Sequence, residues 1–146
     1  MRAVVQRVAE ASVSVDGDVC AKIERGMLVL VGVERDDDHS TIDLFAQKLI
    51  KFRIFSDHLG KMNLNVIEAG GALLVVSQFT LAADTGRGNR PGFSSAAPPE
   101  QARALYEYLL TRLREQAKVP VASGIFAADM KVSLVNDGPV TFTFAM

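Results

Sequence analysis

The hydrophobic pattern begins with the two-residue period of β-strands. The stretch RAVVQRV (residues 2–8) predicts a strand, and ASVSVDGDVCAKIE (residues 11–24) alternates on both sides of DGD, which predicts a hairpin. The run GMLVLVGV (residues 26–33) is almost entirely apolar, which is typical of a strand covered on both faces. The start of the chain is therefore predicted to form a sheet.

Two helices are predicted further along the chain. The acidic cluster ERDDDHS (residues 34–40) is typical of a solvated loop, and Ser40 with Asp43 resembles a capping box for a helix that ends near Phe52. Pro99 suits the first turn of a second helix. Apolar residues recur at helical spacing at Ile42, Phe45, Ala46, Leu49 and Ile50 in the first helix, and at Ala102, Leu105, Tyr106, Leu109, Leu110 and Leu113 in the second.

The remaining segments complete a layered domain. Residues 53–71 are irregular, residues 72–80 predict a strand, and the glycine- and proline-rich residues 83–99 predict a loop. Further strands are expected near GIFA (124–127), MKVSLV (130–135) and VTFTFAM (140–146). Residues 1–146 are thus predicted to form one α/β domain with a mixed sheet and two main helices on one side.

Composition narrows the classes of function. The 146 residues carry a formal net charge of −1, whereas a protein that coats nucleic acid is usually basic, so any nucleic-acid contact must use a local patch. Cys20 is the only cysteine, which excludes an internal disulfide. Because the sequence shows neither a signal peptide nor a membrane-spanning stretch, we expect a cytoplasmic protein that makes no membrane contact.

Several common catalytic arrangements find no support in the sequence. His39 and His58 lie in polar segments that predict surface positions, and neither can be placed beside Ser77, Thr80 or Cys20 as a general base. No Cys/His spacing fits a zinc site, and no phosphate-binding glycine motif follows a strand. We therefore expect no metal and no cofactor.

Polar residues end an apolar strand at SQFTL (residues 77–81). On a strand, Gln78 and Thr80 would share one face and Ser77 and Phe79 the other. This pattern is common where a strand simply leaves the core, since threonine suits strands. It also fits a rigid strand that delivers a hydroxyl and an amide to the mouth of a pocket.

Two other segments carry candidate binding residues. Arg87 and Arg90, in the loop that follows SQFTL, offer positive charge for phosphates. The stretch NDGPVT (residues 136–141) is typical of a hairpin turn. Its Gly138–Pro139 pair is unusual, because X–Pro bonds can be cis and glycine relaxes the restriction that proline places on its predecessor.

The SQFTL and NDGPVT motifs, together with the sequence around them, resemble the D-aminoacyl-tRNA deacylase family. The resemblance covers essentially the whole chain, and two intact motifs that lie far apart and in order make it specific. Phe52 stands where the family pattern leads us to expect tyrosine. The stretches that carry the resemblance are VVQRVAEASVSVDG (4–17), FRIFSDHLGKMNLNV (52–66), VVSQFTLAADTGRGNRPGFS (75–94) and FAADMKVSLVNDGPVTF (126–142).

The resemblance implies a three-layer α/β/β fold and a homodimer. It implies hydrolysis of the ester that joins a D-amino acid to the terminal adenosine of tRNA, a chiral proofreading step in translation. Gly138 and Pro139 of one subunit would enter the other subunit's pocket as a Gly–cisPro element that rejects L-aminoacyl-tRNA, while glycyl-tRNA is expected to be hydrolysed. By resemblance the pocket is lined by Ser77, Gln78, Phe79, Thr80, Phe126 and Met130, with Thr80 as the catalytic candidate and Arg87 and Arg90 as tRNA contacts.

Alternatives remain open for mechanism and for function. Thr80 is one candidate nucleophile, and backbone N–H groups near Phe79 and Thr80, acting with the neighbouring ribose hydroxyl, are the other source of catalysis. We favour the second, because no partner to activate Thr80 is evident. Two rival functions are a dimeric nucleic-acid-associated binding module without catalysis and a general hydrolase of small esters.

Overall fold

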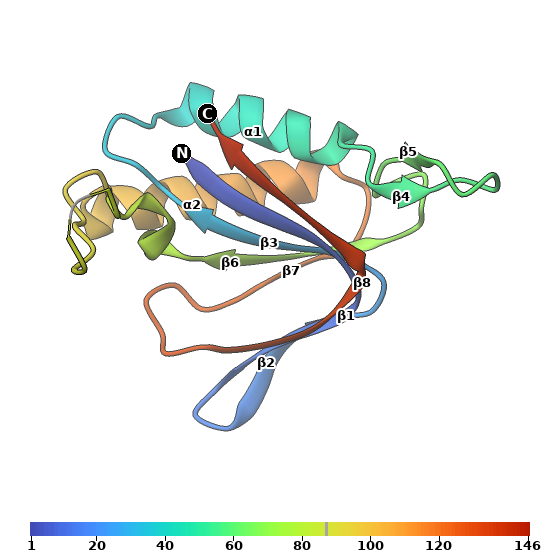
Figure 1. The fold of residues 1–146 in the computed structure, drawn as a ribbon, viewed down its shortest axis with the longest axis horizontal. Helices are drawn as coiled ribbons and strands as arrows, with labels where there is room; N and C mark the ends of the chain where they lie inside the picture. Colours follow the sequence, from blue (N-terminus) through green and yellow to red (C-terminus); the bar gives the residue numbers. More distant parts are fainter. Residues whose placement is uncertain (87) are drawn as a thin grey trace.

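A curved mixed sheet carries two helices on one of its faces (Figure 1). The computed structural model describes residues 1–86 and 88–146. The strand order is β2-β1-β3-β6-β7, and β8 also pairs with β1. The strands of this sheet are β1 (Arg2–Val15), β2 (Asp18–Ile23), β3 (Gly26–Gly32), β6 (Ala72–Ser77), β7 (Val121–Ser123) and β8 (Lys131–Ala145). The helices are α1 (His39–Lys51) and α2 (Pro99–Gln116), and no helix among the described residues is long and apolar enough to cross a membrane.

Alternation along β6 explains how the layers form. Leu73 and Val75 belong to the large core beneath α1 and α2, whereas Leu74 and Val76 belong to a second core on the opposite face. The other members of that second core are Val8, Ala11, Val13, Ile23 and Leu28. The sheet curls so that β2 and the adjoining parts of β1 and β8 form a third layer (Figure 1). The predicted α/β/β order and the two-sided burial of residues 26–33 are therefore confirmed.

Strand β8 is continuous, so the predicted hairpin turn at NDGPVT is wrong. Residues on both sides of this stretch pair with β1: Asn136 with Val8, and Thr141 with Gln6. The residues between them loop out of the strand opposite Arg7. A hydrophobic pattern does not distinguish a loop within one strand from a turn between two strands, because both interrupt the alternation. The first predicted strand and the first arm of the predicted hairpin likewise form one strand, β1, and the second arm forms β2, which pairs with β1.

Three other element boundaries differ from prediction. Strand β6 ends at Ser77, and the chain turns into a 3₁₀ helix, η1 (Phe79–Ala82), in place of a strand that reaches residue 80. GIFA forms no strand, since β7 precedes it. Residues 53–71 contain a small hairpin of β4 (Phe55–Ser56) and β5 (Met62–Leu64).

Helix α1 begins two residues earlier than the predicted cap at Ser40 implies. Asp38 is its N-cap, and the Asp38 carboxylate accepts a hydrogen bond from the Thr41 N–H at 2.9 Å. Ser40 also donates to this carboxylate, so the predicted capping box of Ser40 with Asp43 is wrong. His39 is consequently the first residue of the helix. These hydrogen bonds hold the pKa of Asp38 at about 2.

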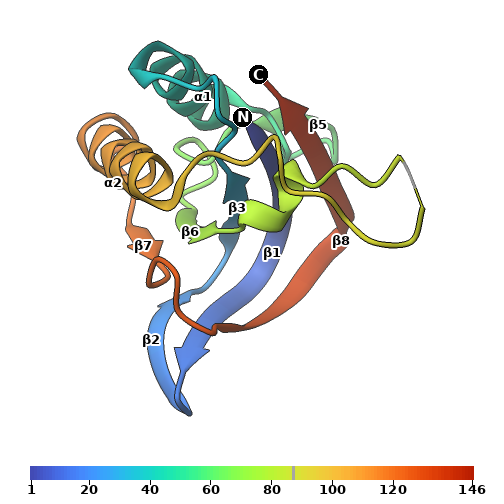
Figure 2. The same cartoon turned by 90° about the vertical axis from the view of Figure 1, so that its left-hand side faces the viewer.

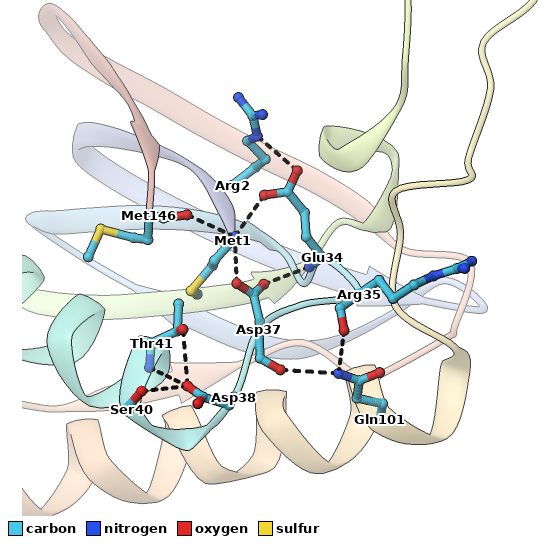
Figure 3. A network of polar contacts seen from close by, with 10 residues as sticks. All are labelled: Met1, Arg2, Glu34, Arg35, Asp37, Asp38, Ser40, Thr41, Gln101 and Met146. Atoms are coloured by element: carbon cyan, nitrogen blue, oxygen red, sulfur yellow. Dashed lines mark hydrogen bonds and ion pairs between the residues drawn. The ribbon is translucent and has the colours of Figure 1, made fainter.

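The two ends of the chain meet at a buried ion cluster (Figure 3). The Met1 ammonium donates to carboxylate oxygens of Glu34 and Asp37, both at 2.7 Å, and to the Met146 carbonyl at 3.4 Å. Burial raises the pKa of Glu34, but hydrogen bonds from this ammonium and from Arg2 outweigh that effect and hold the pKa below its usual value. The cluster fixes the loop that follows β3.

This loop in turn holds the start of α2 (Figure 3). The side-chain amide of Gln101 donates to the carbonyls of Arg35 and Asp37 at 3.0 and 3.1 Å. The N–H of Arg35 donates to the Ser95 carbonyl at 2.9 Å. The charged chain start is thus connected, through one loop, to the segment that leads into α2.

Replacing Asp37 by asparagine is expected to lower the free energy of unfolding by about 3 kcal/mol, because the buried Met1 ammonium then loses one of its two carboxylates. Urea unfolding followed by circular dichroism measures the change. Asp36→Asn removes the same charge at the exposed neighbouring position and is expected to cost less than about 0.5 kcal/mol. Equal effects of the two substitutions would contradict a stabilising role for the cluster.

Candidate functional site

A pocket of about 540 Å³ opens where β6 ends. This volume lies within the range of about 300–1,000 Å³ that is typical of small-molecule sites. The walls come from the end of β6 and the start of η1, from the first turns of α2, and from residues 126–130 between β7 and β8. Of the residues proposed from the sequence, the pocket is lined by Ser77, Gln78, Phe79, Phe126 and Met130.

Strand β3 positions the floor of the pocket. The Gln78 N–H donates to the Val31 carbonyl at 2.7 Å, which keeps the end of β6 in parallel register with β3. Gly32 permits the turn that follows, because a Cβ at this position would lie 2.8 Å from the Gln78 carbonyl oxygen and 3.0 Å from the Leu81 Cβ. Glycine therefore allows η1 to pack directly against the end of β3.

The first residues of η1 leave backbone donors available. The first N–H groups of a helix have no partner within it, and in residues 1–86 and 88–146 those of Phe79 and Thr80 donate to no carbonyl outside η1. Thr80 is exposed and is not among the lining residues, and its hydroxyl accepts a hydrogen bond from the Gln78 side-chain amide at 2.6 Å. His39, at the start of α1, contacts the ring of Tyr108, and His58 lies in the β4–β5 hairpin. Among the described residues, neither histidine is hydrogen-bonded to this hydroxyl.

The opposite wall is built around Phe126. Its ring contacts that of Tyr106, with the centroids 5.9 Å apart. The Tyr106 hydroxyl donates to the Val75 carbonyl at 2.9 Å, and burial raises the pKa of Tyr106 to about 12, so this phenol stays neutral near pH 7. Met130 packs closely over Gly124, where a Cβ would lie 2.6 Å from the Met130 Sδ. The wall is therefore apolar and held by buried contacts.

The Gly138–Pro139 peptide, which is cis, lies in the loop that projects from β8. Asn136 closes this loop: its side-chain oxygen accepts from the Val140 N–H at 2.6 Å, and its amide donates to the Val140 carbonyl at 3.2 Å. From β1, Arg7 donates to the Asp137 carbonyl at 2.8 Å. The loop is thus fixed from both sides.

Sequence reasoning did not identify Arg7 or Asn136. Arg7 is only 12% exposed, and a second nitrogen of its guanidinium donates to the Ile54 carbonyl at 2.7 Å. The available signal was a single charge in the apolar strand RAVVQRV, since a buried charge requires partners. Asn136 is of a residue type that closes turns through its side chain.

The Gly–Pro loop and the pocket lie at different ends of the sheet. Val8, beside the loop, pairs with Gly26, which pairs with Ala72 at the start of β6. Ser77 is at the other end of β6, and at about 3.3 Å per residue the length of this strand alone separates them by about 16 Å. A single chain therefore does not bring Gly138 and Pro139 to the pocket.

The loop after η1 lies beside the pocket mouth. Two hydrogen bonds between the backbones of Asp84 and Gly92, at 2.8 and 2.9 Å, close its base. Phe79, which is 58% exposed, contacts Phe93 of this loop, with the ring centroids 5.2 Å apart. Arg90 is exposed on the loop. Arg87, the other arginine proposed from the sequence, falls outside the described residues.

The chain matches one family over nearly its whole length. The family model described as D-Tyr-tRNA(Tyr) deacylase matches residues 4–145. Curated relatives named D-aminoacyl-tRNA deacylase include proteins from Shewanella amazonensis, 58% identical, and Citrobacter koseri, 59% identical, each over 142 residues that cover 97% of both chains. The chain is thus similar to proteins with this name from end to end.

Solved structures give the same fold. The structure named c-Myc DNA Unwinding Element Binding Protein superposes with a TM-score of 0.94 and 38% identity, covering 100% of this chain and 99% of that chain. A probable eukaryotic D-amino acid tRNA deacylase superposes with a TM-score of 0.85 at 16% identity, covering 98% of this chain and 97% of that chain, which shows a shared fold alone.

The matched residues contain β6, η1, the pocket walls and the Gly–Pro loop. The matches place the chain among the deacylases, a class of ester hydrolases. The chain belongs to the D-Tyr-tRNA(Tyr) deacylase family. The family resemblance predicted from SQFTL, NDGPVTF and their surroundings is confirmed.

Proposed function

We propose that the chain is a cytoplasmic, homodimeric D-aminoacyl-tRNA deacylase that releases the free D-amino acid and tRNA. The observation that carries the proposal is the end-to-end similarity, at 58% identity, to proteins with this name. The site is consistent with this reaction, because an aminoacyl ester is already reactive and requires little more than a positioned water and support for an oxyanion.

The apolar pocket suits the terminal adenosine of tRNA. Phe126 and Met130 offer an apolar wall for a planar base, and Ser77 and Gln78 offer polar groups at the other side. A nucleoside bound in this way would direct its ribose hydroxyls, one of which carries the aminoacyl ester, toward η1. The reacting carbonyl would then lie near the free N–H groups at the start of η1.

Backbone donors are the proposed source of catalysis. Fixed N–H groups of Phe79 and Thr80 would stabilise the oxyanion that forms when water attacks the ester. The Thr80 hydroxyl accepts a hydrogen bond from Gln78 and, among the described residues, makes none with a histidine, so it is poorly suited to act as a nucleophile. The neighbouring ribose hydroxyl of the substrate would help to orient the attacking water.

Thr80→Val is therefore expected to keep measurable deacylation, with kcat reduced by no more than about tenfold, since it removes one hydroxyl and no backbone donor. Single-turnover release of D-[¹⁴C]amino acid from charged tRNA measures the rate. Thr80→Ser, which keeps a hydroxyl, is the control. Complete loss in the valine variant, together with an acyl-enzyme trapped by rapid quench in the parent, would instead identify Thr80 as the nucleophile.

The exposed edge of the sheet supports a homodimer. Strand β8 is 15 residues long and, within the described chain, pairs on one side only, with β1. It exposes Leu134, Val135 and Phe142, and native proteins usually cover a long apolar edge. A second copy across this edge would face Gly138 and Pro139, which lie in the middle of β8. A two-fold axis would then create two equal composite sites.

The proposed role of Gly138 is to select chirality through its backbone. Its carbonyl is a suitable acceptor for the α-ammonium group, which every aminoacyl substrate carries. With that group and the ester fixed, a D side chain would point to open space and an L side chain would meet the Gly–Pro backbone. Because an L side chain is rejected by a steric clash, the site needs no specific contact with a D side chain. One site would therefore accept many D-amino acids.

The decisive test of function compares D-, L- and glycyl-tRNA with one enzyme preparation. We expect release from the D-substrate and from glycyl-tRNA, because glycine has no side chain to exclude, and release from the L-substrate at least about 100-fold slower, equivalent to about 3 kcal/mol of steric selection. Rates are measured with and without EDTA and are expected to be equal. Similar D- and L-rates would contradict the backbone filter, and protection of glycyl-tRNA would contradict selection by exclusion.

A mixing experiment tests whether the site is shared between subunits. Ala128→Trp fills the pocket, and Gly138→Val alters the projecting loop, so each homodimer is expected to be inactive. A mixed dimer would contain one site with both parts intact, so dissociating and reassociating an equimolar mixture is expected to restore about a quarter of wild-type activity. No recovery, with mixed dimers demonstrated by differential tags, would show that one chain supplies both parts.

Nucleic-acid binding without catalysis is the second candidate function. The related structure at 38% identity is named a DNA-binding protein. A pure binder would retain charged tRNA without releasing the amino acid, so the release assay separates the two candidates. A general hydrolase of small esters would act equally well on free D-aminoacyl esters, which the same assay can include.

A further inference from the structure

Arg103 covers the outer side of a pocket wall. The residue lies on α2, near the helix start and on its exposed surface. Its guanidinium carbon lies 4.7 Å from the centroid of the Phe126 ring, and Phe126 in turn contacts Tyr106. Tyr106, Phe126 and Arg103 therefore follow one another from the interior to the surface. The planar cation is exposed but stacked on Phe126, a residue that lines the pocket.

The charge of Arg103 is not used within the described chain. Arg112, further along α2, pairs with Asp43 at 2.7 Å and with Glu115 at 2.8 Å. None of the ion pairs in residues 1–86 and 88–146 includes Arg103. Asp129, the carboxylate among the lining residues, pairs with Lys131 at 2.8 Å. A guanidinium fixed by stacking, with its N–H edge unpaired, is well prepared to bind an anion.

The proposed homodimer would leave this position open. Helix α2 lies in the helical layer with α1 between it and the C-terminal part of β8, as Figure 2 shows. In that dimer the partner's Gly–Pro loop would enter the pocket from the side of β8, whereas Arg103 lies on α2, on the outer side of the wall formed by Phe126. This outer side remains accessible to the part of a substrate that extends out of the pocket.

We propose that Arg103 is a specificity-determining residue that binds the phosphate joining the terminal nucleoside to the rest of the RNA strand. The inference rests on the proposed function, in which the nucleoside lies against Phe126 and its ester reaches η1. The 5′ carbon of the same ribose carries the phosphodiester, which must leave through the pocket mouth. A cation at that mouth favours a polynucleotide substrate over a free aminoacyl-nucleoside, without contact to any base.

The test compares Arg103→Gln and Arg103→Lys on two substrates, D-aminoacyl-tRNA and D-aminoacyl-adenosine, which lacks the phosphate. We expect Arg103→Gln to raise KM for the tRNA substrate about tenfold with kcat nearly unchanged, as for a lost charge-assisted contact. The log–log salt dependence of KM should lose about 0.7 of its slope, the contribution of one single-strand phosphate. Kinetics on D-aminoacyl-adenosine should not change, and lysine should restore part of the loss.

The matched control is Arg114→Gln, which removes the same charge on the same face of α2, about three turns further from the pocket. Equal KM effects of the two glutamine variants would overturn the proposal in favour of general electrostatic attraction. Equal effects of Arg103→Gln on both substrates, or no effect on either, would also overturn it.

Failure of the proposed function gives a different result. If the wild-type chain releases no amino acid, equilibrium binding replaces kinetics, with uncharged tRNA and tRNA lacking its terminal adenosine as ligands. A drop in affinity for intact tRNA in Arg103→Gln, relative to Arg114→Gln, would still support the phosphate contact. Unchanged affinity would overturn it, independently of catalysis.

Discussion

The close parallel pairing of β3 with β6 is the constraint on which the rest of the site depends. A Cβ at Gly26 would overlap the backbone of Ala72, so these strands can approach at their first residues only because glycine stands there. From this contact the register runs unbroken to Val31 and Ser77. The end of β6 therefore lies at a fixed position beside the end of β3, and Gly32 leaves room for the 3₁₀ helix to pack there. Two glycines of one strand thus determine where the pocket floor lies.

The pocket combines fixed backbone groups at one end with apolar side chains over the rest of its surface. The η1 end of the pocket has N–H groups and the Gln78–Thr80 hydrogen bond beside it, and the remaining surface is dominated by apolar side chains. Such a combination suits a substrate that is chemically activated before it arrives. Precision then comes from the packing beneath the backbone, which is why the two cores of β6 are so completely buried.

Periodicity was sufficient to predict the mixed sheet and both helices on one side of it, because apolar residues are spaced at the period of each element from GMLVLVGV to the stripe of α2. The third layer was expected from the family resemblance. Periodicity failed where local hydrogen bonds decide the chain path. Ser77 ends a strand that propensity would extend, and Asn136 turns an apparent hairpin into a loop inside one strand. The walls of the pocket came from family resemblance, since nothing in the types of Phe126 or Met130 distinguishes them from core residues. Arg7 was missed because its short hydrogen bonds go to backbone carbonyls and its carboxylate partner, Asp137, is 130 residues away in the sequence.

Because β6 is buried on both faces, insertions and deletions of single residues within it are poorly tolerated. Leu73 and Val75 enter one core while Leu74 and Val76 enter the other, so adding or deleting one codon in this strand would exchange both sets at once. It would also shift Ser77 and η1 by one residue relative to Val31. By contrast, the loop closed by Asp84 and Gly92 lies outside both cores. Strand β6 therefore tolerates substitution far better than insertion, and a change in chain length is accommodated better in the loop beyond it.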